Sequence, residues 1–304
     1  MIRVGTCSWA DRSILESGSF YPKKIKSAQA RLTYYASRFD TVEVDATYYA
    51  IPAAETASLW VQRTPENFLF HVKAYAALTG HTVDPKTLPE QLRQMLPERE
   101  RDRSYTFIHD PGLTKELARL FGEAIKPLAQ AGKLGLVVFQ FPPWFRYSLS
   151  SLNQILTCRR MVEGFSMGVE FRHASWLKEE KRQEVFSFLR AHGLTYIAAD
   201  EPQLADDSTV PFVPEATTDT VYFRLHGRNA SKWHLSGIKT SLRYDYLYSD
   251  EELQEFCQAA QGFAEKNVFV MFNNCHAGQA MRNALRLKAL LRGEELPEES
   301  ASLF

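Results

Sequence analysis

The chain has 304 residues, of which 45% are hydrophobic and 24% are charged, a composition typical of globular proteins. Its 36 basic residues equal its 36 acidic residues, and a formal net charge of zero argues against an extended nucleic-acid-binding surface. The four cysteines form no C-x-x-C pair, and no apolar run reaches the ~18 residues of a membrane span. We therefore expect a cytoplasmic protein with no signal peptide and no membrane segment.

Short β-rich runs alternate with longer amphipathic stretches along the chain, and this alternation predicts a parallel sheet. The predicted strands are Ile2–Cys7, Thr41–Thr47, Phe68–Ala74, Leu134–Phe141, Ser166–Arg172, Thr195–Asp200, Val221–His226 and Val268–Asn273. The predicted helices lie within Gln29–Phe39, Leu113–Ala131, Lys178–His192 and Ser249–Lys266, and the last opens with a capping box. Eight strands suit a β/α barrel, so we predict an α/β fold with one closed TIM-type barrel domain over residues 1–304. An open doubly wound sheet is the alternative, but the G-x-G-x-x-G motif that often accompanies it is absent.

Two connections exceed the ~2–6 residues usual between such elements. The first is a helical or loop insertion at about 80–110, with three prolines and the charge run Glu98–Arg103. The second is a long loop at about 201–218. Both follow strands, so we expect both at the C-terminal mouth of the barrel, where long loops often act as lids or specificity elements.

The predicted strands are apolar for most of their length and turn polar near their C-terminal ends. In Val42-Glu43-Val44-Asp45, alternation turns the valines toward the helices and the carboxylates into the barrel. The same alternation turns these side chains inward: His71, Lys73, Glu170, Arg172, Arg224 and His226. They could be buried ion pairs that close the barrel, for example Glu43 with Arg172 or Glu170 with Arg224. Because such networks stabilise less well than apolar packing, we favour a function at the mouth.

Six blocks of sequence, taken together, carry a resemblance. They are Val4-Gly5-Thr6-Cys7-Ser8-Trp9, Thr41-Val42-Glu43-Val44-Asp45 with Tyr49, Gln140-Phe141-Pro142-Pro143, Val169-Glu170-Phe171-Arg172-His173 with Trp176, Arg224-Leu225-His226-Gly227, and Phe272-Asn273-Asn274 with Gly278 and Asn283. In this order they resemble the family called domain of unknown function 72, also described as YecE-like. The resemblance implies a β/α barrel and supplies no reaction. Cys7-Ser8 stands where many members have Ser-Gly, and Asp45 stands where Asn is common.

The function we favour is an enzyme that performs acid–base chemistry on a small anionic substrate, phosphate-bearing or nucleotide-like, without a cofactor or resident metal. Arginine forks and a lysine suit such an anion, and histidines near neutral pH can move protons. The predicted catalytic residues are Glu43, Glu170, His173, Asp200 and His226. The predicted substrate-binding residues are Asp45, Tyr49, Lys73, Gln140, Arg172, Trp176, Arg224, Tyr244, Tyr246, Asn273 and Asn274.

Other functions stay open. One is a metal-dependent phosphoester hydrolase or nuclease, which resembles endonuclease IV-type barrels at the level of fold alone. It would use the same carboxylates and histidines as ligands, although no H-E-x-x-H or comparable motif is present. Another is a non-catalytic binder of nucleic acid or of a protein partner, with aromatic residues near the strand ends as contacts. A glycosidase with Glu43 and Glu170 as its two carboxylates is less favoured, because its surroundings are rich in cations.

Overall fold

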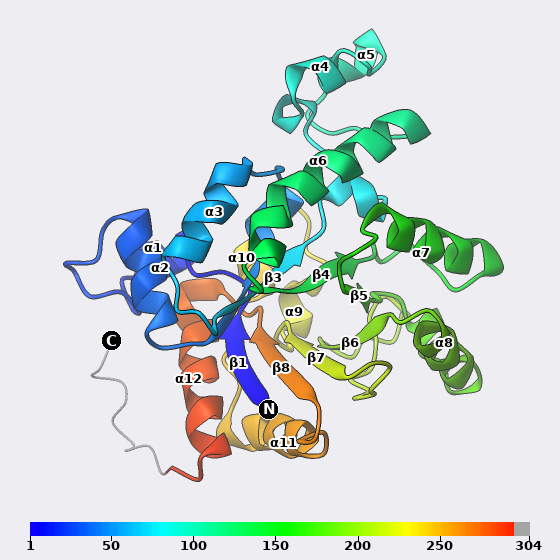
Figure 1. Cartoon of the computed structure of the whole chain (residues 1–304). Helices are drawn as coiled ribbons and strands as arrows, with labels where there is room; N and C mark the ends of the chain where they lie inside the picture. Colours follow the sequence, from blue (N-terminus) through cyan, green and yellow to red (C-terminus); the bar gives the residue numbers. More distant parts are fainter. Residues whose placement is uncertain (295–304) are drawn as a thin grey trace.

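The computed structural model describes residues 1–294, and residues 295–304 of the predicted 1–304 unit lie outside the described part. Eight parallel strands form a nearly closed barrel with helices around it (Figure 1). The strands are β1 (Ile2–Thr6), β2 (Thr41–Val44), β3 (Leu69–Lys73), β4 (Leu134–Gln140), β5 (Met167–Glu170), β6 (Thr195–Asp200), β7 (Thr220–Leu225) and β8 (Asn267–Phe272). Each overlaps one predicted strand, and the predicted α/β barrel is confirmed.

The barrel has one seam without a backbone ladder within residues 1–294. The strand order is β1-β8-β7-β6-β5-β4-β3-β2, so β1 and β2 are the two ends of the sheet. The Tyr35 hydroxyl bridges them, because it accepts a hydrogen bond from Thr6 N at 3.0 Å and donates one to Thr41 O at 3.1 Å. The two backbones are also close at Gly5, where a Cβ atom would lie 2.5 Å from Thr41 O. A side chain therefore joins the ends that no ladder joins.

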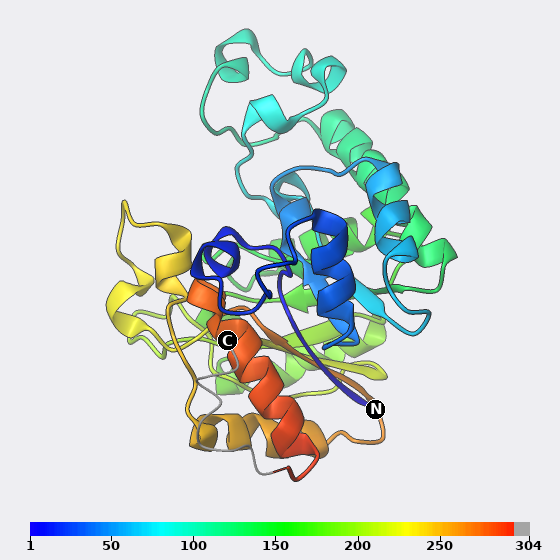
Figure 2. The ribbon, with the colours of Figure 1, turned by 90° about the vertical axis from the view of Figure 1, so that its left-hand side faces the viewer.

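Helices cover the outside of the barrel (Figures 1 and 2). The α-helices are α1 (Arg12–Ser17), α2 (Ala28–Ala36), α3 (Ala54–Gln62), α4 (Glu90–Arg93), α5 (Glu98–Arg101), α6 (Pro111–Gln130), α7 (Leu149–Met161), α8 (Glu179–Ala191), α9 (Ala230–Trp233), α10 (Thr240–Arg243), α11 (Asp250–Gln261) and α12 (Gln279–Leu291). The short 3-10 helices are η1 (Asp45–Tyr48), η2 (Ala76–Thr79), η3 (Pro85–Thr87), η4 (Ala174–Trp176) and η5 (His276–Gly278). The four predicted helices correspond to α2, α6, α8 and α11, and the predicted capping box of Ser249 and Glu252 opens α11.

The two long connections differ in structure. Residues 80–110 contain η3, α4 and α5, and in both views the segment with α4 and α5 projects away from the barrel (Figures 1 and 2). Residues 201–218 contain no helix or strand. This second loop is tied to the barrel at its start, where the buried Glu201 carboxylate accepts a hydrogen bond from Val210 N at 2.7 Å.

Alternation along the strands divides the side chains into two sets. Val42, Val44 and Val169 belong to the apolar core that includes residues of the surrounding helices, as predicted. A second apolar cluster includes residues that face into the barrel. We refer to six of its residues as the apolar interior cluster: Leu136, Val138, Ile197, Tyr222, Phe269 and Met271. On each of these strands the apolar residues precede the polar ones, so the charged side chains gather toward the C-terminal mouth. No helix within residues 1–294 is both long enough and apolar enough to cross a membrane.

Candidate functional site

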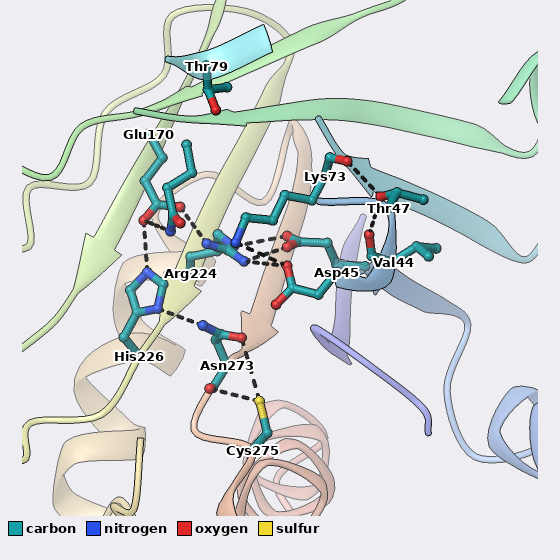
Figure 3. Close-up of polar contacts among 12 residues, drawn as sticks. Val44, Asp45, Thr47, Lys73, Thr79, Glu170, Arg224, His226, Asn273 and Cys275 are labelled. Carbon is teal, nitrogen blue, oxygen red and sulfur yellow. Dashed lines mark hydrogen bonds and ion pairs between the residues drawn. The ribbon is translucent and has the colours of Figure 1, made fainter. Parts of the chain in front are cut away.

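Arg224 of β7 lies at the centre of a network of ion pairs near the C-terminal ends of the strands (Figure 3). Its side chain is 0% exposed. Nε and Nη2 donate to the two carboxylate oxygens of Glu43 at 3.0 and 2.6 Å, and Nη1 donates to Glu170 Oε2 at 2.7 Å. A third carboxylate, that of Asp45, lies 3.2 Å from Nη2. Every guanidinium nitrogen of Arg224 therefore has a carboxylate partner.

On one side of Arg224, Asp45 and Lys73 connect the network to solvent. Asp45 follows β2 and Lys73 ends β3, and Lys73 Nζ lies 3.5 Å from Asp45 Oδ1. The side chains of Lys73 and Asp45 are 11% and 25% exposed. The ammonium group also lies over the Tyr48 ring, 4.4 Å from its centroid, in a cation–π contact.

On the other side, Arg172 joins two carboxylates. Its Nη1 donates to Glu170 Oε1 at 3.1 Å, and its Nη2 lies 2.8 Å from Glu201 Oε2. The Arg172 side chain is 12% exposed, and its guanidinium lies 5.3 Å from the centroid of the Trp233 ring. Arg172 is therefore held from behind by buried carboxylates, while part of its side chain stays open to solvent.

His226 completes the network from β7. Its Nε2 lies 2.9 Å from Glu170 Oε1 and 3.1 Å from Arg172 Nη1, and its Nδ1 lies 2.9 Å from Asn273 Nδ2 (Figure 3). Gln140 Nε2 donates to the same Glu170 oxygen at 2.8 Å. We refer to Glu43, Asp45, Lys73, Glu170, Arg172, Glu201, Arg224 and His226 as the ion network.

The buried position of these groups changes their protonation. Burial, with the nearby Arg172 cation, lowers the pKa of His226 to about 3, so this imidazole is neutral. Burial alone would raise the pKa of Glu170, but Arg224, His226 and Arg172 hold it well below its usual range. Burial raises the pKa of Glu43, and Arg224 offsets this only in part. Burial also raises the pKa of Glu201 to about 7, against the opposing effect of Arg172.

Asp200, predicted to be catalytic, lies on the other face of β6 from the ion network. Ile197 of β6 faces the interior, whereas Tyr196 and Ala198 pack in the outer core. Alternation therefore turns Asp200 outward and Glu201 inward. Asp200 accepts hydrogen bonds from Tyr248 at 2.6 Å and from Arg228 at 3.0 Å, and these contacts tie β6 to the segment that leads into α11.

Four other predicted residues also lie apart from the ion network. His173 caps η4 through Ser175 N, and Trp176 is a buried core residue stacked on Phe171. Tyr246 donates to Glu252 at 2.7 Å. Asn274 donates to Tyr246 O and to Asn283, contacts that fix the chain after β8.

Aromatic side chains lie around the exposed part of the network. Tyr49, which was predicted, is 64% exposed. The ring of Tyr244, also predicted, lies 5.9 Å from that of His226. Trp144 is exposed beside His81, whose ring lies 5.8 Å away.

Three residues of this region were not predicted from the sequence. Glu201 was missed because the strand was taken to end at Asp200, although alternation from Ile197 would have pointed to it. Tyr222 donates to Glu43 Oε2 at 2.7 Å and has the same parity as Arg224 on β7. His81 lies in the long insertion after β3 and had no strand pattern to mark it.

The residues could in principle bind a metal, since carboxylates and histidines are its usual ligands. Within residues 1–294, no group of three or more His, Cys, Asp or Glu side chains is arranged to hold a metal ion. The inward-facing carboxylates instead have arginine or lysine partners.

The fold and the ion network define a TIM-type barrel protein with paired charges at the C-terminal ends of its strands. The family model described as "Protein of unknown function DUF72" matches residues 3–302, so the chain belongs to this family, and the predicted resemblance is confirmed. It is 33% identical over 297 residues to UPF0759 protein YunF of Bacillus subtilis (strain 168), covering 96% of this chain and 95% of that protein.

Two solved structures of this family have the same fold. A DUF72 family protein from Thermotoga maritima MSB8 is 32% identical, with a TM-score of 0.76 over 96% of this chain and 99% of that one. Another, from Enterococcus faecalis V583, is 27% identical, with a TM-score of 0.77 over 98% of this chain and 99% of that one.

Proposed function

We propose that this protein is an enzyme whose substrate is a small anion, held at the C-terminal mouth of the barrel by Lys73 and Arg172. One observation carries the proposal: both cations are paired with carboxylates, Lys73 with the partly exposed Asp45 and Arg172 with the buried Glu170 and Glu201, yet both keep solvent-exposed surface. Such an arrangement holds a charge at a defined place before a ligand arrives, which is what binding and transition-state stabilisation require.

Unused donors support this role. The ammonium group of Lys73 has three N–H donors, and its one carboxylate contact within residues 1–294 is the 3.5 Å pair with Asp45. Arg172 has five N–H donors: Nη1 donates to Glu170 and lies 3.1 Å from His226 Nε2, Nη2 forms an ion pair with Glu201, and Nε makes no hydrogen bond within residues 1–294. Both side chains can therefore donate to a phosphate or carboxylate without breaking the contacts that position them.

Arg224 has a different role from the anion contact suggested by the sequence. It is fully buried and its nitrogens are occupied, so a ligand would have to displace a carboxylate to reach it. We assign it to positioning, because it holds Asp45 on one side and Glu170 on the other. Burying this network costs several kcal/mol relative to apolar packing, and a binding function explains why the barrel interior carries it.

Calorimetric titration with inorganic phosphate tests the anion site, and a mass-spectrometric screen of phosphorylated and carboxylated metabolites tests for turnover. We expect Lys73→Met to weaken phosphate binding by about tenfold or more, the effect of one lost charge-assisted hydrogen bond.

Lys133→Met is the matched control. Lys133 is also a buried lysine beside a barrel strand, but it precedes β4 and donates to Val61 O and Thr64 O at 2.8 and 2.9 Å. Equal affinity for phosphate in the wild type and in Lys73→Met would reject the proposed site. If phosphate binding depends on Lys73 but no metabolite is converted, the anion site stands and the proposed enzymatic activity is rejected.

A further inference from the structure

His81 lies beside the two cations of the proposed anion site. It follows η2 and Gly80, whose positive φ of 76° turns the chain back over the barrel. The imidazole ring is half-buried, with the Tyr48 ring 5.3 Å away and the Trp144 ring 5.8 Å away. Lys73 and Arg172 are both close enough to act on its charge state. The insertion after β3 therefore brings an imidazole to the mouth of the barrel.

Thr79 contacts Nδ1 of this imidazole. Thr79 Oγ1 lies 3.1 Å from Ala76 O and 2.8 Å from His81 Nδ1. The Thr79 hydroxyl has one hydrogen, and the direction of the His81 contact depends on which of the two partners receives it. When the hydroxyl donates to Ala76 O, His81 Nδ1–H donates to Thr79 Oγ1, and this is the tautomer that we assign to His81. In this tautomer Nε2 carries the lone pair, and within residues 1–294 it has no hydrogen-bond partner and is not buried.

The surrounding charges keep His81 unprotonated. Burial, Lys73 and Arg172 lower the pKa of His81 to about 4, so the imidazole is neutral near pH 7. The other titratable group packed against the ring is Tyr48, whose hydroxyl pKa is itself raised by burial. An anion bound between Lys73 and Arg172 would cancel part of their field and raise the pKa of His81, so the ligand itself would make the imidazole a better base.

We propose that His81 Nε2 is the proton acceptor for a hydroxyl group of the anion that Lys73 and Arg172 hold. This inference rests on the proposed function and names its base, because Glu43, Glu170 and His226 are fully buried in the ion network. In the step, the O–H bond breaks, its electron pair stays on oxygen, and the proton moves to Nε2. The resulting imidazolium keeps its Nδ1–H bond to Thr79, and the new oxyanion lies beside the two cations. The substrate class is a small anion with an O–H donor, such as a protonated phosphate or a hydroxy acid.

Phosphate and sulfate test the acceptor directly, because both are tetrahedral oxyanions but only phosphate, mainly a monoanion at about pH 6, carries an O–H donor, so charge alone would favour the sulfate dianion. We expect the wild type to bind phosphate about tenfold more tightly than sulfate. His81→Phe keeps a ring between Tyr48 and Trp144 but removes the acceptor, so it should lose this preference and leave sulfate affinity unchanged. Equal affinities in the wild type, or a preference that survives in His81→Phe, would overturn the role of His81 and leave the anion site standing. Failure of both anions to bind would overturn the anion site as well.

The tautomer provides a readout that needs no ligand. In two-bond ¹H–¹⁵N correlation spectra at about pH 7, we expect a protonated Nδ1 and an unprotonated Nε2 for His81. Thr79→Val keeps the side-chain shape but removes the acceptor for Nδ1–H, and it should convert the ring to a mixture of tautomers. A wild-type spectrum with a protonated Nε2 would overturn the proposal whatever the binding data show.

Discussion

The two ends of the barrel interior are built on different physical principles. The apolar interior cluster fills the space by shape, with side chains such as Ile197, Phe269 and Met271 fully or almost fully buried. The ion network, nearer the C-terminal ends of the strands, fills the space with charges that satisfy one another. Tyr222 joins the two, because its ring belongs to the apolar cluster and its hydroxyl donates to Glu43.

The difference shows what each end contributes. Apolar packing stabilises a fold with no cost of desolvated charge, so the apolar cluster is explained by stability alone. The ion network loses solvation energy at every charge, and its gain is the defined position of groups at the mouth. Stability and positioning thus separate between the two ends of the barrel interior, and the three substitutions below test that separation.

The largest effect is expected from Arg224→Met, which removes the cation shared by three carboxylates. Leaving buried charges without their partner costs about 3–5 kcal/mol, so we expect a large loss of free energy of unfolding or a failure to fold. Urea unfolding followed by circular dichroism measures it. The triple variant Glu43→Gln, Glu170→Gln, Arg224→Met removes the orphaned charges too, and it should recover part of the lost stability.

Arg228→Met is the matched control for Arg224→Met. Arg228 also contacts three carboxylates, those of Asp200, Glu252 and Glu255, but its side chain is 29% exposed. Solvent can screen Glu252 and Glu255, and Tyr248 still donates to the buried Asp200, so we expect a loss of only about 1–2 kcal/mol. Equal losses in the two variants would contradict the view that burial, rather than the number of ion pairs, sets the cost.

The sequence carried enough information for the fold and for the inward set of charges, because alternation within a strand is a local property. Glu43, Glu170 and Arg224 were predicted to face inward, and the predicted pair of Glu170 with Arg224 is present. The other suggested pair was wrong: Glu43 contacts Arg224 and not Arg172, since the pairing depends on register across the barrel.

Two parts of the site could not be predicted from the local sequence pattern. Asp200 and Glu201 are consecutive, and the choice between them depends on which face of β6 each occupies, a parity that Ile197 sets. His81 reaches the mouth through an insertion that has no strand period, and its tautomer depends on the contacts of Thr79. Loop residues are placed by tertiary contacts, so their partners are not encoded at a fixed spacing.

A substitution of His71 tests the apolar end of the barrel interior. His71 is a titratable group there and has no charged partner within residues 1–294. Its ring packs 4.4 Å from that of Phe269 and 4.8 Å from that of Tyr222, and its Nδ1 accepts from Leu136 N at 3.0 Å. Burial lowers the pKa of His71 to about 3, from 6.5 in its ordinary state. The unfolded chain therefore binds a proton that the folded chain does not, so stability is lost as the pH falls below about 6.5.

His71→Asn should reduce this loss. Asparagine keeps an acceptor for Leu136 N but does not titrate, so the variant is less stable than the wild type near pH 7 because of lost packing. We expect the difference to shrink by about 2–3 kcal/mol between about pH 6.5 and about pH 4. Urea unfolding at a series of pH values measures it. His226 still titrates in the variant with the same sign, so some acid sensitivity remains, and parallel curves for the two proteins would contradict the assignment.

The smallest effect is expected from Gly168→Ala, which tests whether the apolar interior cluster is set by shape. A Cβ at position 168 would lie 2.8 Å from Ile197 Cδ1 and 3.2 Å from Leu136 Cδ1, so the cluster has no room for it. Overpacking of this kind costs about 1–3 kcal/mol, and no charge is involved, so the loss should be independent of pH. Ile197→Val removes the Cδ1 atom that a Cβ at position 168 would meet, and the double variant should be more stable than Gly168→Ala alone.

Gly122→Ala on α6 is the control, because its Cβ would meet Phe165 at an ordinary 3.8 Å, and there alanine should stabilise the helix. A Gly168→Ala loss that changed with pH as the Arg224→Met loss does would mean that the two ends of the interior are one coupled unit.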